Sequence, residues 1–345
     1  MLQQKTVLVV GAGASFDFGL PLGNELKKRI SAALRFQTEF SRPGATSNVI
    51  SDQIKRYCVL KEIRNQVGEY FDCAASLSKG VVVSDSIDEY VERAGSEKIK
   101  VLAKMAISRL ILEGERSSLL WFDKSNTRNS INFEFVNENG SWIQKLFSKL
   151  RSGVATDNID TVFDNFEVIS FNYDRCIEHY FFHAIRAFWN LTFEQADFII
   201  KKLNIIYPYG KVGEYLPADH LYRAGAVGFG DLDKNVCDIF ENIDTYSEYR
   251  SSKTLDNIRE SLNGVEKIIF LGCHYHKQNL DVLSVAEIKS HPSIYGTVLG
   301  YTTDEDIDAI RFELSGRFST DAGKIRLSPV KSFNLFENYQ RLMII

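Results

Sequence analysis

One stretch near the start of the chain, Val7 to Pro21 (VLVVGAGASFDFGLP), constrains the fold more than any other part of the sequence. Four aliphatic residues end in Gly11-Ala12-Gly13, and a helical pattern of apolar residues begins soon afterwards. A strand of a parallel sheet is buried on both faces and therefore reads as an unbroken aliphatic run. Glycines directly after such a strand let backbone N–H groups approach a phosphate. The stretch predicts the first strand–turn–helix unit of a nucleotide-binding α/β sheet.

Two familiar glycine-rich loops do not fit this stretch. The dinucleotide fingerprint of dehydrogenases requires a third glycine three residues after the second, where Phe16 stands. The phosphate loop of ATPases requires Gly-Lys-Ser/Thr, whereas Gly19 is followed by Leu20-Pro21. A simple tight turn is the alternative interpretation of the small residues. The segment that remains is GAGAS, consisting of Gly11, Ala12, Gly13, Ala14 and Ser15, followed by GLP.

A second informative stretch, FEVISFNYD, spans Phe166 to Asp174. Its β-rich run brings Asn172 and Asp174 to a strand end, and a helical pattern of apolar residues follows from Cys176. Both side chains accept hydrogen bonds from free N–H groups, so capping of that helix is an alternative role. If the two motifs form one site, we expect the amide of Asn172 to lie close to the turn at Gly11 and Gly13.

Two later strands also end in glycine-containing loops. The first, in NIIYPYGKVG from Asn204, is followed by Tyr209-Gly210, and the second, in KIIFLGCHYHKQN from Lys267, is followed by Gly272. In this order the four motifs resemble the strand-end motifs of the sirtuin-like NAD-binding fold. The resemblance covers about residues 1–300 and implies a Rossmann-like parallel sheet.

The resemblance also implies roles for individual residues. Asn172 would hold the nicotinamide ribose and the attacking water, and Asp174 would recognise the carboxamide. The family usually has His-Gly where this chain has Tyr209-Gly210, and a phenol with a pKa of about 10 is a poor base at neutral pH, although it can donate to a ribose hydroxyl. The residues that would bind NAD are Gly11, Ala12, Gly13, Ala14, Ser15, Pro21, Gly210 and Gly272.

These residue types suit cleavage of the bond between nicotinamide and ribose. The reaction passes through an oxocarbenium-like state, and its leaving group is already cationic, so no strong acid is needed. A fixed polar frame around the ribose and a placed water are what such a reaction requires, and a neutral amide provides them.

The rest of the chain predicts one domain, residues 1–345, with a helical insertion at about 37–163 and a C-terminal edge segment at about 302–345. Leu22 to Leu34 has the period of a helix that packs one face on the sheet. The insertion contains SIDEY at Ser86, which also resembles a recurring family segment and is equally typical of an exposed helix start. Residues 218–263 suit either a mobile segment or a self-association surface.

Composition excludes several classes of protein. A formal net charge of −4 without a long basic run gives no nucleic-acid footprint. Five widely spaced cysteines without a C-x-x-C pair do not suggest a disulfide framework, and they place the resemblance in the zinc-free branch of the family. The pairs His179/His183 and His274/His276 do not form a recognised metal motif, so we expect no metal. With no leader and no long apolar run, we expect a soluble, cytoplasmic protein.

The leading hypothesis is an NAD glycohydrolase that produces nicotinamide and ADP-ribose as a triggered antiphage effector, a role common among zinc-free bacterial relatives. It would take NAD as substrate and work as a homo-oligomer, with a separately encoded activating partner, for which a ring-forming ATPase is one candidate. The alternative is a subunit that binds NAD or ADP-ribose without cleaving it. A protein deacetylase is disfavoured by the absent zinc cysteines, and a dehydrogenase by the missing fingerprint.

Overall fold

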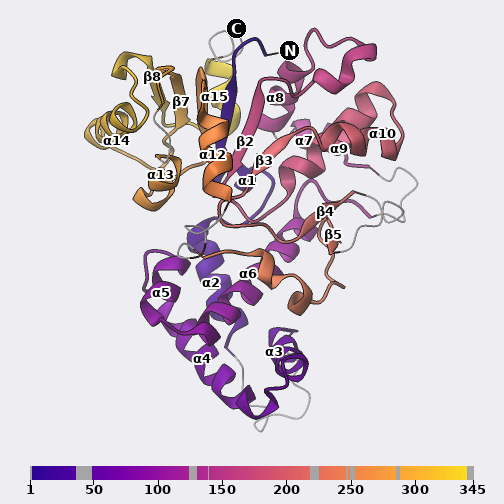
Figure 1. Cartoon of the computed structure of the whole chain (residues 1–345), viewed down its shortest axis with the longest axis vertical. Helices are drawn as coiled ribbons and strands as arrows, with labels where there is room; N and C mark the ends of the chain where they lie inside the picture. Colours follow the sequence, from indigo (N-terminus) through magenta and orange to yellow (C-terminus); the bar gives the residue numbers. More distant parts are fainter. Residues whose placement is uncertain are drawn as a thin grey trace.

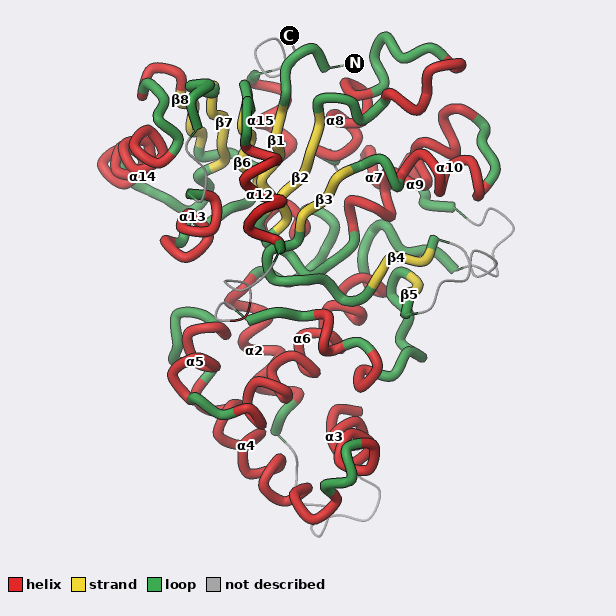
Figure 2. Tube along the Cα trace, viewed as in Figure 1, coloured by secondary structure: helices red, strands yellow, loops and turns green. Residues whose placement is uncertain are grey.

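The central feature of the fold is a six-stranded, all-parallel sheet (Figures 1 and 2). The computed structural model describes residues 2–35, 49–123, 130–138, 140–217, 225–245, 248, 253–284 and 288–339. The strand order, β3-β2-β1-β6-β7-β8, is the doubly wound order of Rossmann-like folds. The predicted α/β fold with a Rossmann-like parallel sheet is therefore confirmed. The strands are β1 (Thr6–Val10), β2 (Phe166–Ser170), β3 (Asn204–Ile206), β6 (Lys267–Leu271), β7 (Ser293–Thr297) and β8 (Ile325–Ser328).

Strand β1 occupies the centre of the sheet and is buried on both faces. Leu8 and Val10 face one apolar core, Val7 and Val9 face another, and all four side chains are at most 1% exposed. Burial on both faces was predicted from the aliphatic run and is confirmed. The first core contains helices α8 (Trp142–Leu150), α9 (Cys176–Trp189) and α15 (Ser332–Asn338), and the second contains α12 (Thr254–Leu262), α13 (Lys277–Leu283) and α14 (Asp304–Arg317).

Between β1 and β2 the described residues form helices and no strand. Helices α2–α6 lie beyond the carboxyl ends of the strands (Figure 2) and share a third apolar core. Their arrangement brings them close to the edge of the sheet where ligands bind in this class of fold. Besides α8 and two short 3-10 turns, the helices between β1 and β2 are α1 (Ala12–Phe16), α2 (Gly23–Ala33), α3 (Val49–Leu60), α4 (Val67–Gly80), α5 (Ile87–Ala94), α6 (Glu97–Ser117) and α7 (Phe133–Glu138).

The prediction that the helix after Pro21 packs on the sheet is wrong. Leu26, Ile30 and Leu34 belong to the third core and pack with apolar residues of α4 and α6. Helix α6 has 21 residues and buries apolar side chains around much of its circumference. Some of these apolar side chains therefore pack against α2 in the third core.

Other differences are local. The polar stretch 124–140 predicts a loop with at most a short strand, but helix α7 lies within it; residues 124–129 and 139 are outside the described part. The run from Tyr295 to Tyr301 predicts a strand, but β7 begins earlier and ends before Gly300, whose φ of +105° is incompatible with a strand. The stretch from Ala322 predicts edge strands and a final helix, and it contains β8 and α15; α14 precedes it.

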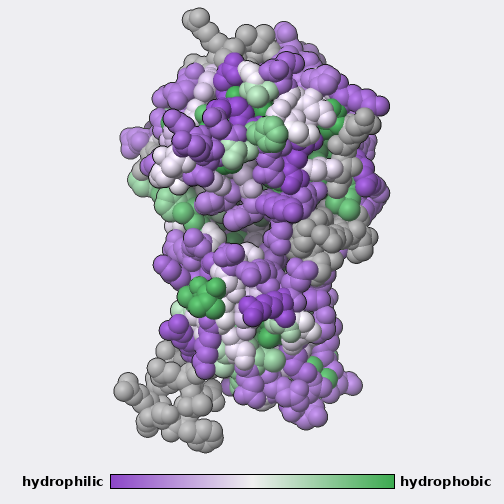
Figure 3. All heavy atoms as spheres, turned by 90° about the vertical axis from the view of Figure 1, so that its left-hand side faces the viewer, coloured by the Kyte–Doolittle hydropathy of each residue, from purple (hydrophilic) through white to green (hydrophobic). Residues whose placement is uncertain are grey.

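A small second sheet lies beside β3 and follows α10 (Phe193–Ile200). It consists of two parallel strands, β4 (Glu214–Leu216) and β5 (Ala226–Gly228), and its position near α9 and α10 is visible in Figure 1. None of the helices in the described part of the chain combines the length and apolar character needed to cross a membrane. The surface in Figure 3 is mainly hydrophilic, with hydrophobic residues in small, separate groups.

Candidate functional site

The turn after β1 is in close backbone contact with the turn after β6. Gly11 N–H donates to Leu271 O at 2.9 Å, and Gly13 N–H donates to Gly272 O at 3.0 Å. A Cβ atom at Gly11 would lie 2.6 Å from Gly272 O, and one at Gly13 would lie 2.8 Å from Gly272 Cα. Gly272 itself has φ +60°, and a Cβ there would lie 2.0 Å from Ala14 N. Glycine is therefore required at all three positions for the two turns to meet.

The amide of Asn172 lies on this turn, where we expected it. Its Nδ2 atom donates to Gly11 O at 3.0 Å and to Ser15 Oγ at 2.9 Å, and the residue is 8% exposed. These bonds connect positions separated by more than 150 residues and fix the orientation of the amide plane. Among the described residues, no hydrogen bond engages the Oδ1 atom of Asn172, so this acceptor remains available.

Asp174 lies beside the same turn, and its carboxyl group is buried. Its Oδ1 accepts from Cys176 N–H at 3.1 Å, so Asp174 also has the capping function considered for it. Burial raises the pKa of Asp174 from 3.8 to about 6, and hydrogen bonds with Cys176 and Ser15 partly offset this rise. Asp174 is therefore a carboxyl group that changes charge near neutral pH, in a position next to Ser15.

Tyr209 and Gly210 follow β3, and neither has a described hydrogen bond to Asn172. The hydroxyl of Tyr209 donates to Asn279 Oδ1 at 2.9 Å, and its ring packs at 5.7 Å from the ring of Phe171. Gly210 has φ +71°, and a Cβ there would lie 1.9 Å from Asn242 O. Tyr209 thus links the β3 loop to α13, and Gly210 allows the segment before Asp244 to cross it.

Pro21 lies at the other side of the first turn, against helix α6. The residue is buried, and a Cβ at Gly114 would lie 3.4 Å from Pro21 Cδ. From the opposite direction, Trp142 Nε1 donates to Ala14 O at 3.0 Å. The turn that carries Ala14 and Ser15 is therefore held by helices on two sides.

Tyr173, between Asn172 and Asp174, lies near groups from three separate parts of the chain. Burial, followed by the nearby Asp88, Tyr209 and Asp244, raises the pKa of Tyr173. Asp88 belongs to the SIDEY segment, whose Ser86 Oγ caps α5 by accepting from Glu89 N–H at 3.0 Å. SIDEY is therefore a helix start, as the simpler interpretation held, and it also faces the FNYD motif.

The histidines of the described ranges do not form a metal site. No three histidine, cysteine, aspartate or glutamate side chains there are grouped so that they could hold a metal ion. His179 bonds to Tyr215 at 2.8 Å and stacks on Phe229 at 3.9 Å. Burial, and secondarily Arg186, lowers the pKa of His183 to about 3. The rings of His274 and His276 stack at 5.4 Å. His220, ten residues after Gly210 in the sequence, lies outside the described residues.

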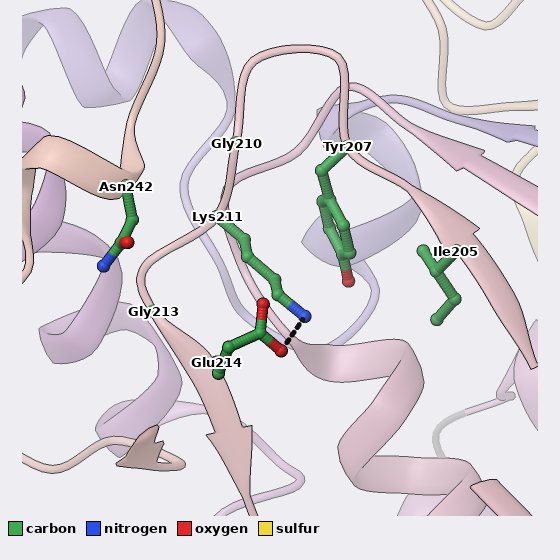
Figure 4. A pocket seen from close by; sticks show the side chains of 7 residues that line it. All are labelled: Ile205, Tyr207, Gly210, Lys211, Gly213, Glu214 and Asn242. Carbon is green, nitrogen blue, oxygen red and sulfur yellow. Dashed lines mark ion pairs between the residues drawn. The ribbon is translucent and has the colours of Figure 1, made fainter. Parts of the chain in front are cut away.

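A pocket of about 260 Å³ opens beside Gly210, at the end of β3 (Figure 4). Lys211 and Glu214 point toward one another across it and form an ion pair of 3.2 Å. Lys211 also contacts the buried Glu178 at 3.1 Å, and the Tyr207 hydroxyl donates to Glu178 at 2.5 Å. Because two carboxylates neutralise its lysine, this pocket has no cation that is free to bind phosphate. The lining residues are Ile205, Tyr207, Gly210, Lys211, Gly213, Glu214 and Asn242.

A charged pair beneath the site was not predicted from the sequence. Glu115 of α6 and Arg175, which directly follows Asp174, form an ion pair with both side chains 0% exposed. Arginine directly after the FNYD motif was visible in the sequence, but nothing there identified its partner sixty residues earlier. Helix α6 contains several charged residues, and glutamate is usually exposed, so the sequence does not indicate that Glu115 is buried.

Comparisons of the chain with family models, with curated proteins and with solved structures found no match in any of the three. The assignment of a function therefore depends on the site itself.

Proposed function

We propose that the chain is an NAD glycohydrolase of the zinc-free sirtuin-like type, which cleaves NAD to nicotinamide and ADP-ribose. The observation that carries this proposal is the docking of the Asn172 amide on Gly11 and Ser15, at the carboxyl ends of the central strands. Ligands of doubly wound sheets bind at this edge, near the point where the strand order reverses between β1 and β6.

The geometry of the site suits the proposed chemistry. With Nδ2 held by two acceptors, the Oδ1 atom of Asn172 can orient a water molecule or a ribose hydroxyl without carrying charge. The C1–N bond to nicotinamide breaks, neutral nicotinamide leaves, and the oxygen of water bonds to C1 and releases a proton. Asp174 would accept a hydrogen bond from the carboxamide N–H, and this role requires the ionised form that predominates above pH 6.

NAD would lie across the turns after β1 and β6. In this proposal the segment from Gly11 to Ser15 contacts the pyrophosphate, Pro21 and Gly210 lie toward the nicotinamide ribose, and Gly272 lies toward the adenosine. The N–H groups of Gly11, Gly13 and Ala14 already donate to protein carbonyls. Phosphate contact would therefore fall to the other polar groups of the turn.

A second candidate function is a subunit that binds NAD or ADP-ribose without cleaving it. The observation in its favour is Tyr209, which stands where the family has histidine and whose proton is donated to Asn279. In either case we propose an effector of antiphage defence in the cytoplasm. It would assemble as a homo-oligomer and be triggered by a separately encoded partner, for which a ring-forming ATPase is a candidate.

The test is release of nicotinamide from NAD by the purified full chain, alone and with its co-purifying partners, measured by chromatography. Asn172→Ala should reduce release about 100-fold, the loss typical for removal of one preorganised polar group. Asn204→Ala is the matched control, because Asn204 lies at the opposite end of the sheet and bonds to Glu167. NAD binding by the wild type without nicotinamide release would favour the second candidate, and absence of binding would refute both.

A further inference from the structure

A charged pair in the protein interior connects the candidate site to helix α6. Arg175 Nη2 lies 2.5 Å from Glu115 Oε2, Arg175 Nε donates to Glu115 Oε1 at 3.1 Å, and both side chains are fully buried. Glu115 lies in the last turn of α6, and Arg175 lies between Asp174 and the start of α9. The pair therefore bridges the helical region and the turn that carries the FNYD motif.

Backbone groups complete the arrangement. The N–H of Arg175 donates to Glu115 Oε1 at 3.0 Å, and the N–H of Gly230 donates to Glu115 Oε2 at 2.9 Å. The guanidinium donates to Val227 O at 2.6 Å and to Gly228 O at 3.0 Å. Helix α6, the turn after β2 and the end of β5 are thus joined through one carboxylate and one guanidinium.

Stability alone does not account well for such a pair. Removing two charges from water offsets most of their mutual attraction, so a buried ion pair is often no more stabilising than apolar side chains of similar size. A planar guanidinium that bonds to both oxygens of a carboxylate does, however, fix distance and direction. Because the backbone N–H of Arg175 joins the same carboxylate, this geometry extends to the peptide bond directly after Asp174.

We propose that Glu115 and Arg175 are positioning residues for the reaction proposed above, on which this inference rests. They hold the turn with Asn172 and Asp174 in the orientation that brings the amide onto Gly11 and Ser15. We assign neither side chain a contact with the substrate, and both act through the backbone of the turn. The position of the α2–α6 helices and the geometry of the site are consequently linked.

The primary test compares Glu115→Gln with Glu113→Gln. Glu113 lies on the same helix and pairs with Arg109 at 2.7 Å, but its side chain is 40% exposed. Turnover is measured well below the melting temperature of each variant and is normalised to folded protein. Glu115→Gln should lower kcat about 100-fold with KM changed less than about threefold, because small displacements of reacting groups have effects of this size. Glu113→Gln should leave both constants unchanged.

A double variant controls for the uncompensated charge that Glu115→Gln leaves behind. Glu115→Gln with Arg175→Met removes both charges, so a loss of folding due to an unpaired guanidinium is avoided. We expect this variant to fold and to show the same low kcat. Wild-type kcat in either folded variant would overturn the proposal.

A measurement without turnover separates this inference from the proposed function. Glu115→Gln should displace the Asn172 amide from Gly11 O and Ser15 Oγ, and the displacement is followed by NMR of the side-chain N–H signals of Asn172. Glu113→Gln should leave these signals in place. Displaced signals without nicotinamide release in the wild type would refute the proposed reaction but support the positioning of the turn. Unchanged signals in Glu115→Gln would refute the positioning.

Discussion

Replacing Asp174 by asparagine should make the fold more stable above pH 6 and at the same time remove activity. Burial is the main reason that the pKa of Asp174 rises from 3.8 to about 6. A pKa difference of one between the folded and the unfolded chain corresponds to about 1.4 kcal/mol. Keeping the carboxylate charged inside the protein therefore costs about 3 kcal/mol at neutral pH. Asparagine carries no charge, and its carbonyl oxygen can still accept from Cys176 N–H.

The sign of the effect depends on pH in a defined way. Below pH 3.8 the carboxyl group is protonated in both the folded and the unfolded chain, and the wild type has no penalty. Between pH 3.8 and 6 the unfolded chain ionises first, and the penalty grows until the folded protein also ionises. The advantage of Asp174→Asn should therefore be absent at pH 3.5 and complete, at about 3 kcal/mol, above pH 6.

The assay is urea unfolding of wild type and variant at a series of pH values, together with nicotinamide release at pH 7.5. Asp160→Asn is the matched control: the exposed Asp160 bonds to Lys202, which lowers its pKa, so its replacement should not stabilise the protein at any pH. Equal unfolding free energies for wild type and Asp174→Asn at pH 7.5 would show that Asp174 is not a buried charge. Undiminished nicotinamide release would show that it does not recognise the carboxamide.

Three further predictions concern the surroundings of the site. Gly272→Ala should prevent the two turns from meeting and lower the free energy of unfolding by more than about 3 kcal/mol, measured by thermal unfolding. The control is Gly264→Ala, where φ is +69° but the space around the residue is open, and it should lower the same free energy by about 1 kcal/mol. The pKa of His183 falls from 6.5 to about 3 mainly because of burial, so the wild type should lose about 3 kcal/mol between pH 6.5 and pH 4 through this group. His183→Met should remove that loss, and the same acid slope in both proteins would contradict it. Tyr209→Phe removes the donor to Asn279 and should lower the free energy of unfolding by about 1 kcal/mol. It should also raise KM more than it lowers kcat. Loss of all turnover would instead show that the phenol acts as an acid or base.

The sequence was sufficient to predict the sheet and the convergence of two of its loops. Four aliphatic residues at Val7 predicted a strand buried on both faces, and the Asn172 motif at the end of another strand predicted a neighbour at the same edge. Both predictions rest on the period of strands and on the rule that parallel strands end at one edge. The resemblance to a family added the substrate and the roles of individual residues, which the fold alone does not test.

What the sequence could not supply was the set of contacts between segments far apart. Helix α2 packs on α6 instead of on the sheet, and local periodicity shows that a helix has an apolar face but not which element covers it. The partner of Arg175 and the reason for glycine at position 272 are likewise pairwise properties. The glycines at positions 11 and 13 predicted a phosphate-binding turn. In the structure they are equally required because the backbone at Gly272 packs directly against them.

This double requirement affects how the site should be interpreted. Gly11 and Gly13 would be essential for folding even if no nucleotide ever bound, so loss of function on replacing them would not identify a ligand. Asn172 is different, because a small apolar side chain at this strand end would remove one donor to Ser15 Oγ and one to Gly11 O, and Gly11 O would keep its bond from Ala14 N–H. The raised pKa of Asp174 also indicates a functional site, because a charge kept in the interior at a cost in stability is typical of such sites. Asparagine would serve equally well if the only role of residue 174 were to cap the helix. The polar pair on the FNYD turn, more than the glycines, is therefore where function can be separated from folding.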